Sequence, residues 1–418
     1  MSRSQFWVRA GSAIVAIALV IAFASSAVAG RFPLWLRSSA SPSSPASPAG
    51  DPGGVHPSKA GTASPSPSAS PADRTPAALP GLSLQQMAGQ RVIYSYRGLT
   101  PPARLLGLIS HGDVGGVIFF GPNISSPAQL ASVITELDQA NASPLNPVRE
   151  PLLLMTDQEG GLVRRLPGAP YLSELQIGES ANPAAAAASA GADAGVNLRG
   201  IGMNTNLAPV LDVYRQPGDF DDQYQRSYSM NPAVVAELGA DFIAAQQRAG
   251  VAATAKHFPG LGAAAQSQDT DNEPVTLNLS LATIRNVDEL PYKAAIAAGV
   301  KLVMVSWAVY PALDPGRPAG LSATIVDGEL RQRLGFQGVT ITDALEAGAL
   351  RAYGTFQNRG LLAAEAGMDL VLCSAQDVSE GVQAAVGLEE GYRDGQLGQE
   401  AFTAALRRVL ALRASLGD

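Results

Sequence analysis

The order of apolar runs along this chain constrains its fold more than any other feature. After Leu82, short runs rich in Val, Ile and Leu alternate with stretches of helical spacing that end at Gly. The runs are apolar at successive positions, which is typical of parallel strands buried on both faces. They occupy residues 91–94, 116–120, 152–156, 206–210, 251–255, 302–305, 339–341 and 370–372.

This alternation predicts the architecture of residues 82–418. The clearest helical stretches lie at 232–250, 280–299 and 322–334. Eight strands separated by helices predict an α/β fold, a single (β/α)8 barrel of the TIM type. A doubly wound sheet is the alternative, but no Gly-rich dinucleotide turn follows the first strand.

The first 29 residues predict export. Arg3 and Arg9 precede an apolar run over residues 10–29, which ends in Ala27-Val28-Ala29. These features are typical of a signal peptide with a small-residue cleavage site. The run is also close to the ~20 residues that span a bilayer, so an uncleaved membrane anchor is the rival interpretation. Both place the remaining chain outside the cytoplasmic membrane.

Residues 30–81 are predicted to be a linker. They are rich in Ser, Pro, Ala and Gly and poor in large apolar residues. Such a segment cannot bury enough surface to offset the entropy of ordering, and its prolines favour an extended spacer. We therefore expect three parts: a signal or anchor at 1–29, a disordered linker at 30–81 and the barrel domain at 82–418.

Composition excludes several classes of function. The net charge is −7 and no basic block is present, which argues against a nucleic-acid partner. The single cysteine cannot form an intrachain disulfide, and three histidines offer few ligands for a metal. We expect a monomer without a metal or cofactor.

Polar residues gather where the predicted strands end. Asp157, Asp212 and Asp343 each follow a different strand, and Lys256 with His257 follows a fourth. The carboxyl ends of barrel strands form the face on which barrel enzymes build their sites. Charges from four strands at one mouth would cost desolvation energy unless they were paired or used, which predicts a functional site there.

Seven motifs surround or accompany these residues. The three strongest are DQEGGLVRRL at 157–166, KHFPG at 256–260 and GVTITDAL at 338–345, and the four weaker ones are GVIFF at 116–120, NLAPVLDV at 206–213, RSY at 226–228 and LGF at 334–336. Together they resemble glycoside hydrolase family 3, and more narrowly its single-domain bacterial β-N-acetylhexosaminidases, which trim peptidoglycan fragments. The resemblance covers about residues 82–412.

The resemblance implies a role for each site residue. Asp343 would be the nucleophile, since retaining glycosidases need a carboxylate that attacks C1 of the sugar. Asp212 would be a structural carboxylate near the mouth, without a chemical role. The sugar would be bound by Asp157, Arg165, Arg226, Lys256 and His257.

Each of these roles has a plainer alternative. Asp157 could be held by Arg165 without touching a ligand. His257, expected as a hydrogen-bond donor to the sugar, could instead bond the backbone of its own loop. Arg226 could form a surface ion pair, and Asp343 could cap a helix that starts at Ala344. The pair Gly160-Gly161 could let the backbone approach a ligand.

The acid/base loop departs from the family pattern. The hexosaminidases carry Asp-Ser-His or Asp-Thr-His after the KHFPG motif, and its His donates the proton to the leaving group. Here the loop over 261–271 reads LGAAAQSQDTD, and the tripeptide aligns best with Asp269-Thr270-Asp271. Asp271, or Asp269 in a gapless count, takes the place of the His. Ser306-Trp307, where the family often has a His-containing pair, is a second departure, expected in the pocket wall.

Three functions remain open from the sequence. The first is an exported exo-acting β-glycosidase that removes N-acetylhexosamine from glycans such as cell-wall fragments, with Asp271 or Asp269 as the acid. The second is a glycan-binding barrel that has lost its proton donor. The third is a phosphorylase, which transfers the sugar to phosphate and needs less acid assistance.

Overall fold

The computed structural model describes residues 81–417. The predicted signal or anchor and all but the last residue of the predicted linker lie outside these residues. Within the described part, no helix is both long and apolar enough to cross a bilayer.

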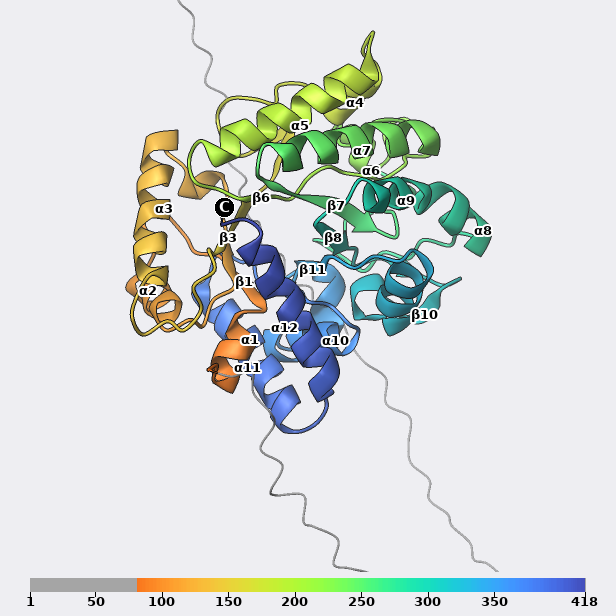
Figure 1. The fold of residues 1–418 in the computed structure, drawn as a ribbon. Coiled ribbons are helices and arrows are strands. Elements are labelled where there is room, and N and C mark those ends of the chain that lie inside the picture. Colours follow the sequence, from red (N-terminus) through yellow and green to blue (C-terminus); the bar gives the residue numbers. More distant parts are fainter. Residues whose placement is uncertain (1–80, 418) are drawn as a thin grey trace, which may run out of the picture. The chain divides into compact units, whose positions relative to one another are not determined.

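Eight parallel strands close into a barrel, as the alternation of apolar runs predicts (Figure 1). Each strand pairs with the next barrel strand in the chain, and the last pairs with the first. The prediction of a (β/α)8 fold is therefore confirmed. The barrel strands are β1 (Val92–Tyr94), β2 (Gly116–Ile118), β3 (Leu153–Thr156), β6 (Thr205–Asn206), β7 (Ala252–Phe258), β8 (Leu302–Val305), β11 (Val339–Ala344) and β12 (Leu370–Leu372).

Helices surround the barrel, and short elements decorate its loops (Figure 1). Two small antiparallel ribbons join β4 (Gln158–Gly160) to β5 (Val163–Arg164) and β9 (Val309–Tyr310) to β10 (Asp314–Pro318). The helices are α1 (Leu84–Gly89), α2 (Ala103–Ser110), η2 (Gly121–Asn123), α3 (Pro127–Asn141), α4 (Glu174–Gly178), α5 (Pro183–Arg199), α6 (Phe220–Gln223), α7 (Pro232–Arg248), α8 (Leu281–Thr283), η3 (Ile284–Asp288), α9 (Leu290–Ala297), η4 (Ala319–Leu321), η5 (Thr324–Arg333), η6 (Gly348–Tyr353), α10 (Phe356–Glu365), α11 (Val378–Arg393) and α12 (Gln399–Ala414).

The hydrophobic core has two layers. Inward-facing strand residues such as Ile93, Met155 and Ile341 fill the barrel, and Val409 and Leu412 of α12 pack against this inner group. The second layer lies between the strands and the surrounding helices. Filling the interior with side chains makes the barrel a packed core rather than a pore, so a ligand site can form only at an end.

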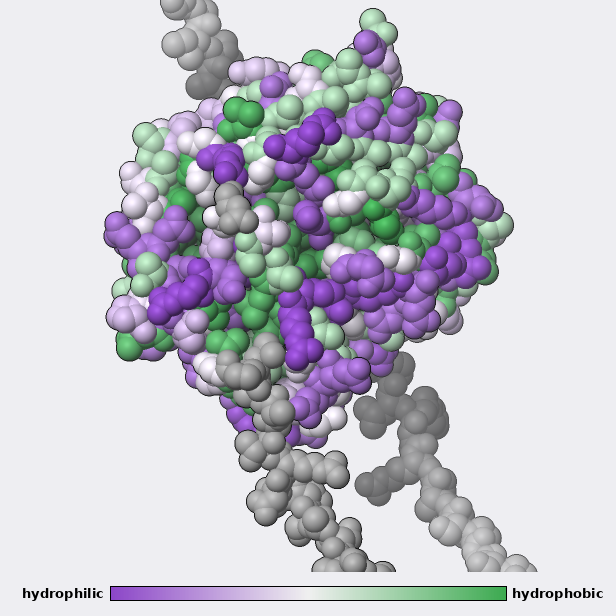
Figure 2. Space-filling model, in the orientation of Figure 1, coloured by the Kyte–Doolittle hydropathy of each residue, from purple (hydrophilic) through white to green (hydrophobic). Residues whose placement is uncertain are grey.

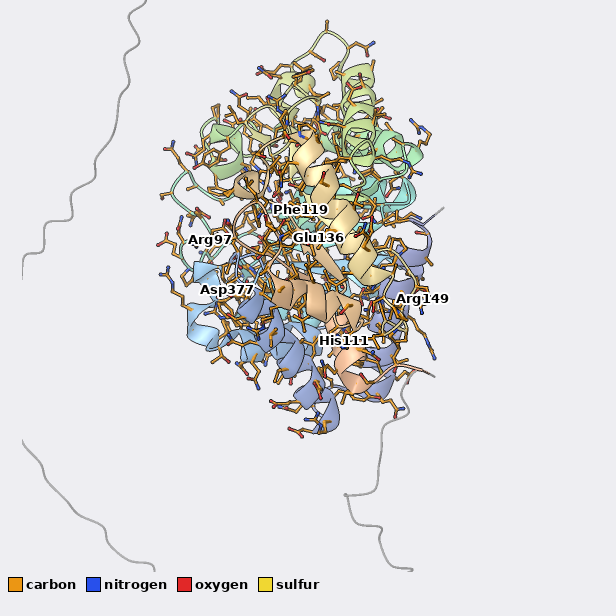
Figure 3. All side chains as sticks on the ribbon, turned by 90° about the vertical axis from the view of Figure 1, so that its left-hand side faces the viewer. Arg97, His111, Phe119, Glu136, Arg149 and Asp377 are labelled. Carbon is orange, nitrogen blue, oxygen red and sulfur yellow. The ribbon has the colours of Figure 1, made fainter. Side chains whose placement is uncertain are left out.

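Side chains from the two ends of the barrel separate clearly in Figure 3. Arg97 and Asp377, from loops that follow β1 and β12, lie on one side. His111 and Arg149, from loops that precede β2 and β3, lie on the other. His111 is exposed there, and its Nδ1 lies 2.8 Å from the Gly107 carbonyl oxygen. It therefore lies at the end opposite the polar strand ends. Figure 2 shows hydrophilic side chains gathered over the α8 and β10 region of the outer shell.

Three strand boundaries differ from the prediction where polar residues meet the mouth. β7 continues through Lys256 and His257 to Phe258, and β11 continues through Asp343 to Ala344. The expected strand at 206–210 is instead β6, Thr205–Asn206, followed by an isolated bridge at Val210. Pro209 has no N–H to donate to a ladder, which accounts for the interruption.

Two helix predictions need correction. The stretch expected at 280–299 is helical, but it is divided into α8, η3 and α9, and Pro291 lies in the first turn of α9, where its missing N–H is tolerated. No helix starts at Ala344, because β11 includes that residue and helical structure resumes only at Gly348 in η6. The alternative that Asp343 is a helix cap is therefore excluded.

Candidate active site

A pocket of about 340 Å³ opens at the carboxyl ends of the strands. This volume is within the range of small-ligand sites. All eight predicted catalytic and sugar-binding residues line it: Asp157, Arg165, Arg226, Lys256, His257, Asp269, Asp271 and Asp343. The structure thus brings together side chains that lie up to 186 positions apart in the sequence (343 − 157).

Lys256 links two carboxylates on one side of the pocket. Its Nζ lies 2.8 Å from Asp157 Oδ1 and 2.8 Å from Glu159 Oε1. Arg165 is farther from Asp157, at 3.9 Å, and keeps 37% of its side chain exposed. Asp157 is thus held mainly by Lys256, and the looser Arg165 has donors free for a ligand.

Arg226 anchors the same network from below. Its Nε and Nη2 donate to the two oxygens of Glu159 at 2.9 Å each, and Nη1 lies 3.2 Å from Asp221 Oδ1. With 15% of its side chain exposed, Arg226 is not a surface ion pair, so that alternative is wrong. Burial opposes ionisation of Glu159, but Arg226 and Lys256 outweigh it and lower the pKa of this carboxyl to about 2.

Replacement of Glu159 by glutamine is expected to destabilise the fold by about 3–5 kcal/mol, because two buried cations lose their shared counter-charge. Chemical denaturation measures this loss. The carboxyl pKa is lowered from 4.5, so its contribution is complete above about pH 4.5 and is lost as the pH falls towards 2. The difference between parent and variant should shrink over that interval. Glu237→Gln, on the exposed side of α7, should change stability by less than about 0.5 kcal/mol. Equal effects of both changes would contradict the network.

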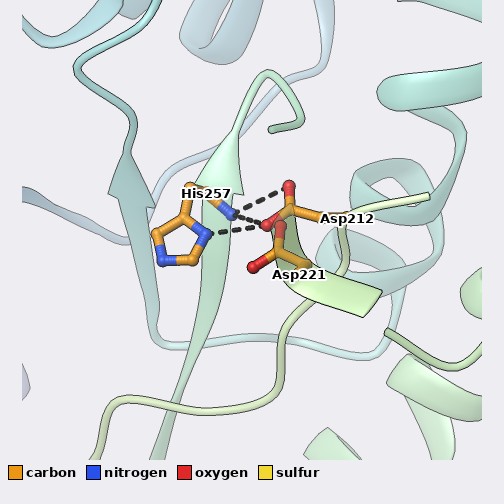
Figure 4. Close-up of side chains that lie close together, drawn as sticks. All are labelled: Asp212, Asp221 and His257. Atoms are coloured by element: carbon orange, nitrogen blue, oxygen red, sulfur yellow. Dashed lines mark hydrogen bonds and ion pairs between the residues drawn. The ribbon is translucent and has the colours of Figure 1, made fainter. Parts of the chain in front are cut away.

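Asp212, Asp221 and His257 form a buried trio, in which Asp212 orients the His257 ring (Figure 4). Asp212 lies 2.7 Å from His257 Nδ1, accepts the His257 backbone N–H at 3.3 Å and accepts the Leu261 N–H at 2.5 Å. The partner of His257 is thus a carboxylate in the segment that follows β6 and the Val210 bridge, and the alternative of a bond to its own loop backbone is wrong. Asp212 acts as the structural carboxylate that the sequence predicts.

His257 is neutral in this setting. Burial and the nearby Arg226 lower its pKa to about 4. Asp212 keeps a carboxylate that three N–H groups approach, although burial raises its pKa to about 6. Nδ1 therefore carries the proton and donates a hydrogen bond to Asp212, which leaves the Nε2 lone pair without a partner among the described residues. His257 thus offers the pocket an acceptor, not the donor expected from the sequence.

The same trio forms a possible metal-ligand set, because Asp212, Asp221 and His257 offer ligand atoms within 4.8 Å of one another. Its groups already have other partners, since Nδ1 of His257 bonds Asp212 and Asp221 pairs with Arg226. Burial, followed by the neighbouring Asp212, raises the pKa of Asp221 to about 7, which favours a shared proton between the two acids. The trio needs no cation to be balanced.

Asp343 lies near the end of β11, and its Oδ1 accepts the N–H of Ala344 at 2.8 Å. The strand is held beside it by Trp307, whose Nε1 donates to the Ala344 carbonyl oxygen at 2.8 Å. Trp307 is fully buried, and neither it nor Ser306 lines the pocket. The expectation that this pair lies in the pocket wall is therefore wrong, and Trp307 instead supports the strand that carries Asp343.

Hydrogen bonds within the loop over 261–273 distinguish the two acid candidates, Asp269 and Asp271. Asp269 uses both carboxylate oxygens within the loop, accepting the Asp271 N–H at 2.9 Å and the Asn272 amide at 2.6 Å. Among residues 81–417, no side chain or backbone group hydrogen-bonds the Asp271 carboxyl. Asp269 thus shapes the loop, whereas Asp271 is free to face a ligand.

Asp271 has the protonation behaviour of an acid. Part of its surface is exposed in the open pocket, but the surrounding protein displaces enough water to raise its pKa. The carboxylates of Asp343 and Asp269 add to this effect, and the pKa reaches about 7. A carboxyl with this pKa is a proton donor near neutral pH, as in other sites where paired acids differ in environment.

Gly348 holds the loop over 261–273 against the segment that follows β11. The Gly348 and Ala349 N–H groups donate to the Asp271 and Thr270 carbonyl oxygens at 2.7 and 3.0 Å. A Cβ at Gly348 would lie 2.1 Å from the Asn272 carbonyl oxygen, so the two loops meet closely only because this residue is glycine.

Gly348→Ala is therefore expected to destabilise the protein by about 1–3 kcal/mol, because backbone must move to admit the methyl group. Thermal unfolding gives the measurement. The matched control is Gly107→Ala in α2, where a Cβ meets nothing within 4 Å. That change should stabilise by up to about 1 kcal/mol through helix propensity. A Gly348 variant as stable as the parent would show that the loop contact is unimportant.

Several site residues escape sequence reasoning. Glu159 and Asp221 stand inside or near the quoted motifs, but nothing in their spacing marks them as the buried partners of Arg226. Glu174 is buried as well, and its Oε1 accepts the Val210 N–H that β6 leaves unpaired. Gly160 and Gly161 prove to approach Leu172 and Ser173 of the protein, so the suggestion that they accommodate a ligand is wrong.

Charged side chains of both signs thus line the pocket, and a comparison with known families places the chain in one of them. The model of the glycosyl hydrolase family 3 N-terminal domain matches residues 84–412. The chain belongs to glycoside hydrolase family 3. It is therefore a glycosidase, and the resemblance drawn from its motifs is confirmed.

Individual similar proteins agree with this assignment. A secreted glycosyl hydrolase of Arthroderma benhamiae is 46% identical over 80% of this chain and 94% of its own length. A β-hexosaminidase of Nitrosomonas eutropha is 34% identical over 65% of this chain and 77% of its own. A solved family 3 β-N-acetylglucosaminidase from Paenibacillus sp. str. FPU-7 superposes with a TM-score of 0.75 at 34% identity, covering 81% of this chain and 64% of that one.

Proposed function

We propose that the protein is an exported, exo-acting glycosidase that removes terminal β-linked N-acetylhexosamine from glycans such as cell-wall fragments, with retention of configuration. The observation that carries this proposal is the presence of Asp343 and the hydrogen-bond-free carboxyl of Asp271 in one pocket with a set of sugar-binding charges. The names of the relatives support the hexosamine preference. The apolar N-terminal run and the secreted relative support export.

The proposed reaction has two steps. In the first, an Asp343 carboxylate oxygen bonds to C1 of the sugar while the C1–O bond to the leaving group breaks, and Asp271 gives its proton to the departing oxygen. In the second, water attacks C1 of the glycosyl-enzyme, and Asp271 takes a proton from it. The bond to Asp343 breaks, and a β-configured sugar is released.

Four further pocket residues hold the sugar in place. Asp157 can accept two hydroxyl protons, Lys256 and Arg165 can donate, and His257 Nε2 can accept. All three nitrogens of the Arg226 guanidinium bond Glu159 and Asp221. In this proposal Arg226 therefore does not make the sugar contact that the sequence predicts, but holds Glu159 and, through it, Lys256.

The test is hydrolysis of two β-N-acetylglucosaminides, one with nitrophenol and one with a sugar as the leaving group. Cleavage of both, with a β-configured product seen first by NMR, supports the proposal. An α-configured first product would exclude retention. Release of glucose from the matching β-glucoside at the same rate would exclude a hexosamine preference.

One alternative has an observation in its favour, namely that the loop over 261–273 holds no histidine. A glycan-binding barrel without a competent acid would bind N-acetylglucosamine saturably and turn over neither substrate. Calorimetric titration alongside the hydrolysis assay separates this alternative from the enzyme.

A further inference from the structure

An exposed aromatic ring lies at the mouth of the pocket. Tyr224 keeps 46% of its surface exposed, and among the large apolar side chains exposed in the described part of the chain it alone lines the pocket. Phe220, which also lines the pocket, packs against it, with ring centroids 5.8 Å apart and planes at 77°. Edge-to-face packing of this kind holds a ring in a defined orientation.

Tyr224 belongs to the side of the pocket that carries the acid loop. The Phe220 N–H donates to the Ala264 carbonyl oxygen at 3.0 Å, and the Gln223 side chain donates to the Gln266 carbonyl oxygen at 2.9 Å. Asp221, between these residues, pairs with Arg226 of the charged network. The α6 segment is thus tied both to the sugar-binding charges and to the loop that holds Asp271.

This position matches the path of the leaving group. The barrel interior closes the pocket from below. In the exo action proposed above, the terminal sugar fills the pocket and the group attached to its C1 extends through the mouth. The oxygen that leaves must lie between Asp343 and its proton donor. Whatever is bonded to that oxygen therefore passes the acid loop, next to the α6 segment.

We propose that Tyr224, backed by Phe220, is the platform for the sugar ring of the leaving group. The apolar face of a pyranose buries its C–H groups on an aromatic ring, while its hydroxyls stay in water at the open mouth. Tyr224 thereby selects glycan substrates over small aglycones. This inference rests on the proposed glycosidase function and adds the specificity of its leaving-group side.

The test compares Tyr224→Ala with the parent on two substrates. One is the β-1,4 disaccharide of N-acetylglucosamine, and the other is β-N-acetylglucosaminyl azide, whose leaving group has no ring. The ratio of kcat/KM for the disaccharide to that for the azide should fall about tenfold, the effect of one aromatic contact. Tyr224→Phe should keep the ratio. Tyr171→Ala, at a tyrosine that is 69% exposed and outside the pocket, should keep it too.

An unchanged ratio in Tyr224→Ala, or an equal fall with Tyr171→Ala, would overturn the platform while leaving the glycosidase proposal intact. If the parent cleaves neither substrate, the proposed function fails instead. Calorimetric binding of the disaccharide then decides the platform by itself, because its dissociation constant should rise about tenfold in Tyr224→Ala and stay constant in Tyr171→Ala.

Discussion

Asp343→Ala is expected to lower hydrolysis of nitrophenyl β-N-acetylglucosaminide by about 10⁴-fold or more, because the variant cannot form the glycosyl-enzyme bond. Asp343 accepts one N–H and is half-buried, so its loss should leave the fold intact. Added azide should restore turnover and give the α-configured glycosyl azide, since the anion attacks C1 from the face that Asp343 vacates. The rate of nitrophenol release and the NMR spectrum of the product are the measurements.

Asp138→Ala is the matched control, because this exposed aspartate lies on α3 away from the pocket. It should leave the rate within about twofold of the parent. If Asp343→Ala hydrolyses the substrate as fast as the parent, or if azide gives only the β-configured azide, Asp343 is not the nucleophile and the retaining mechanism proposed above fails.

Asp271→Asn is expected to lower hydrolysis of the disaccharide by about 10²–10⁴-fold, because a sugar oxygen leaves poorly without a proton. The nitrophenyl substrate should lose much less, since nitrophenolate leaves unaided. Burial and the neighbouring Asp343 raise the Asp271 pKa to about 7. The acid is therefore protonated below pH 7, and disaccharide hydrolysis by the parent should decline above it. The variant should lack this decline, which a pH profile of kcat/KM measures.

Asp269→Asn serves as the comparison, because Asp269 has the same charge in the same loop but uses its oxygens to hold Asp271 and Asn272. It should slow hydrolysis of both substrates to a similar degree and retain a decline, at a lower pH than in the parent because the Asp269 charge helps to raise the Asp271 pKa. If Asp269→Asn removes the decline and Asp271→Asn keeps it, the gapless alignment identifies the acid correctly and the geometric assignment to Asp271 is wrong.

The fold is predictable from the sequence because buried parallel strands leave a strong local pattern. The predicted runs at 302–305 and 370–372 have the same first and last residues as β8 and β12. The largest differences from this pattern lie where strands enter the site. Lys256, His257 and Asp343 are polar and resemble loop residues, yet their backbones keep the strand geometry because the pocket, not solvent, receives their side chains.

The site is predictable in part. The sequence identifies Asp157, Lys256 and Asp343 because charged residues directly after apolar runs must gather at one end of a barrel. The sequence does not identify Glu159 and Asp221, because nothing in the local sequence distinguishes a carboxylate buried against Arg226 from one in solvent. Their roles appear only when distances and burial are known.

The sequence by itself determined the barrel, the family and the set of residues at its mouth, since these follow from local periodicity and from ordered motifs. Only the tertiary structure decided which partners those residues have. Asp269 and Asp271 both line the pocket, but Asp269 uses both carboxylate oxygens within the loop, whereas the Asp271 carboxyl has no hydrogen-bond partner among the described residues. The structure also directs His257 Nδ1 to Asp212 and places Tyr224 beside the loop over 261–273. Hydrogen-bond partners and desolvation depend on neighbours that are distant along the chain, and no local pattern encodes them.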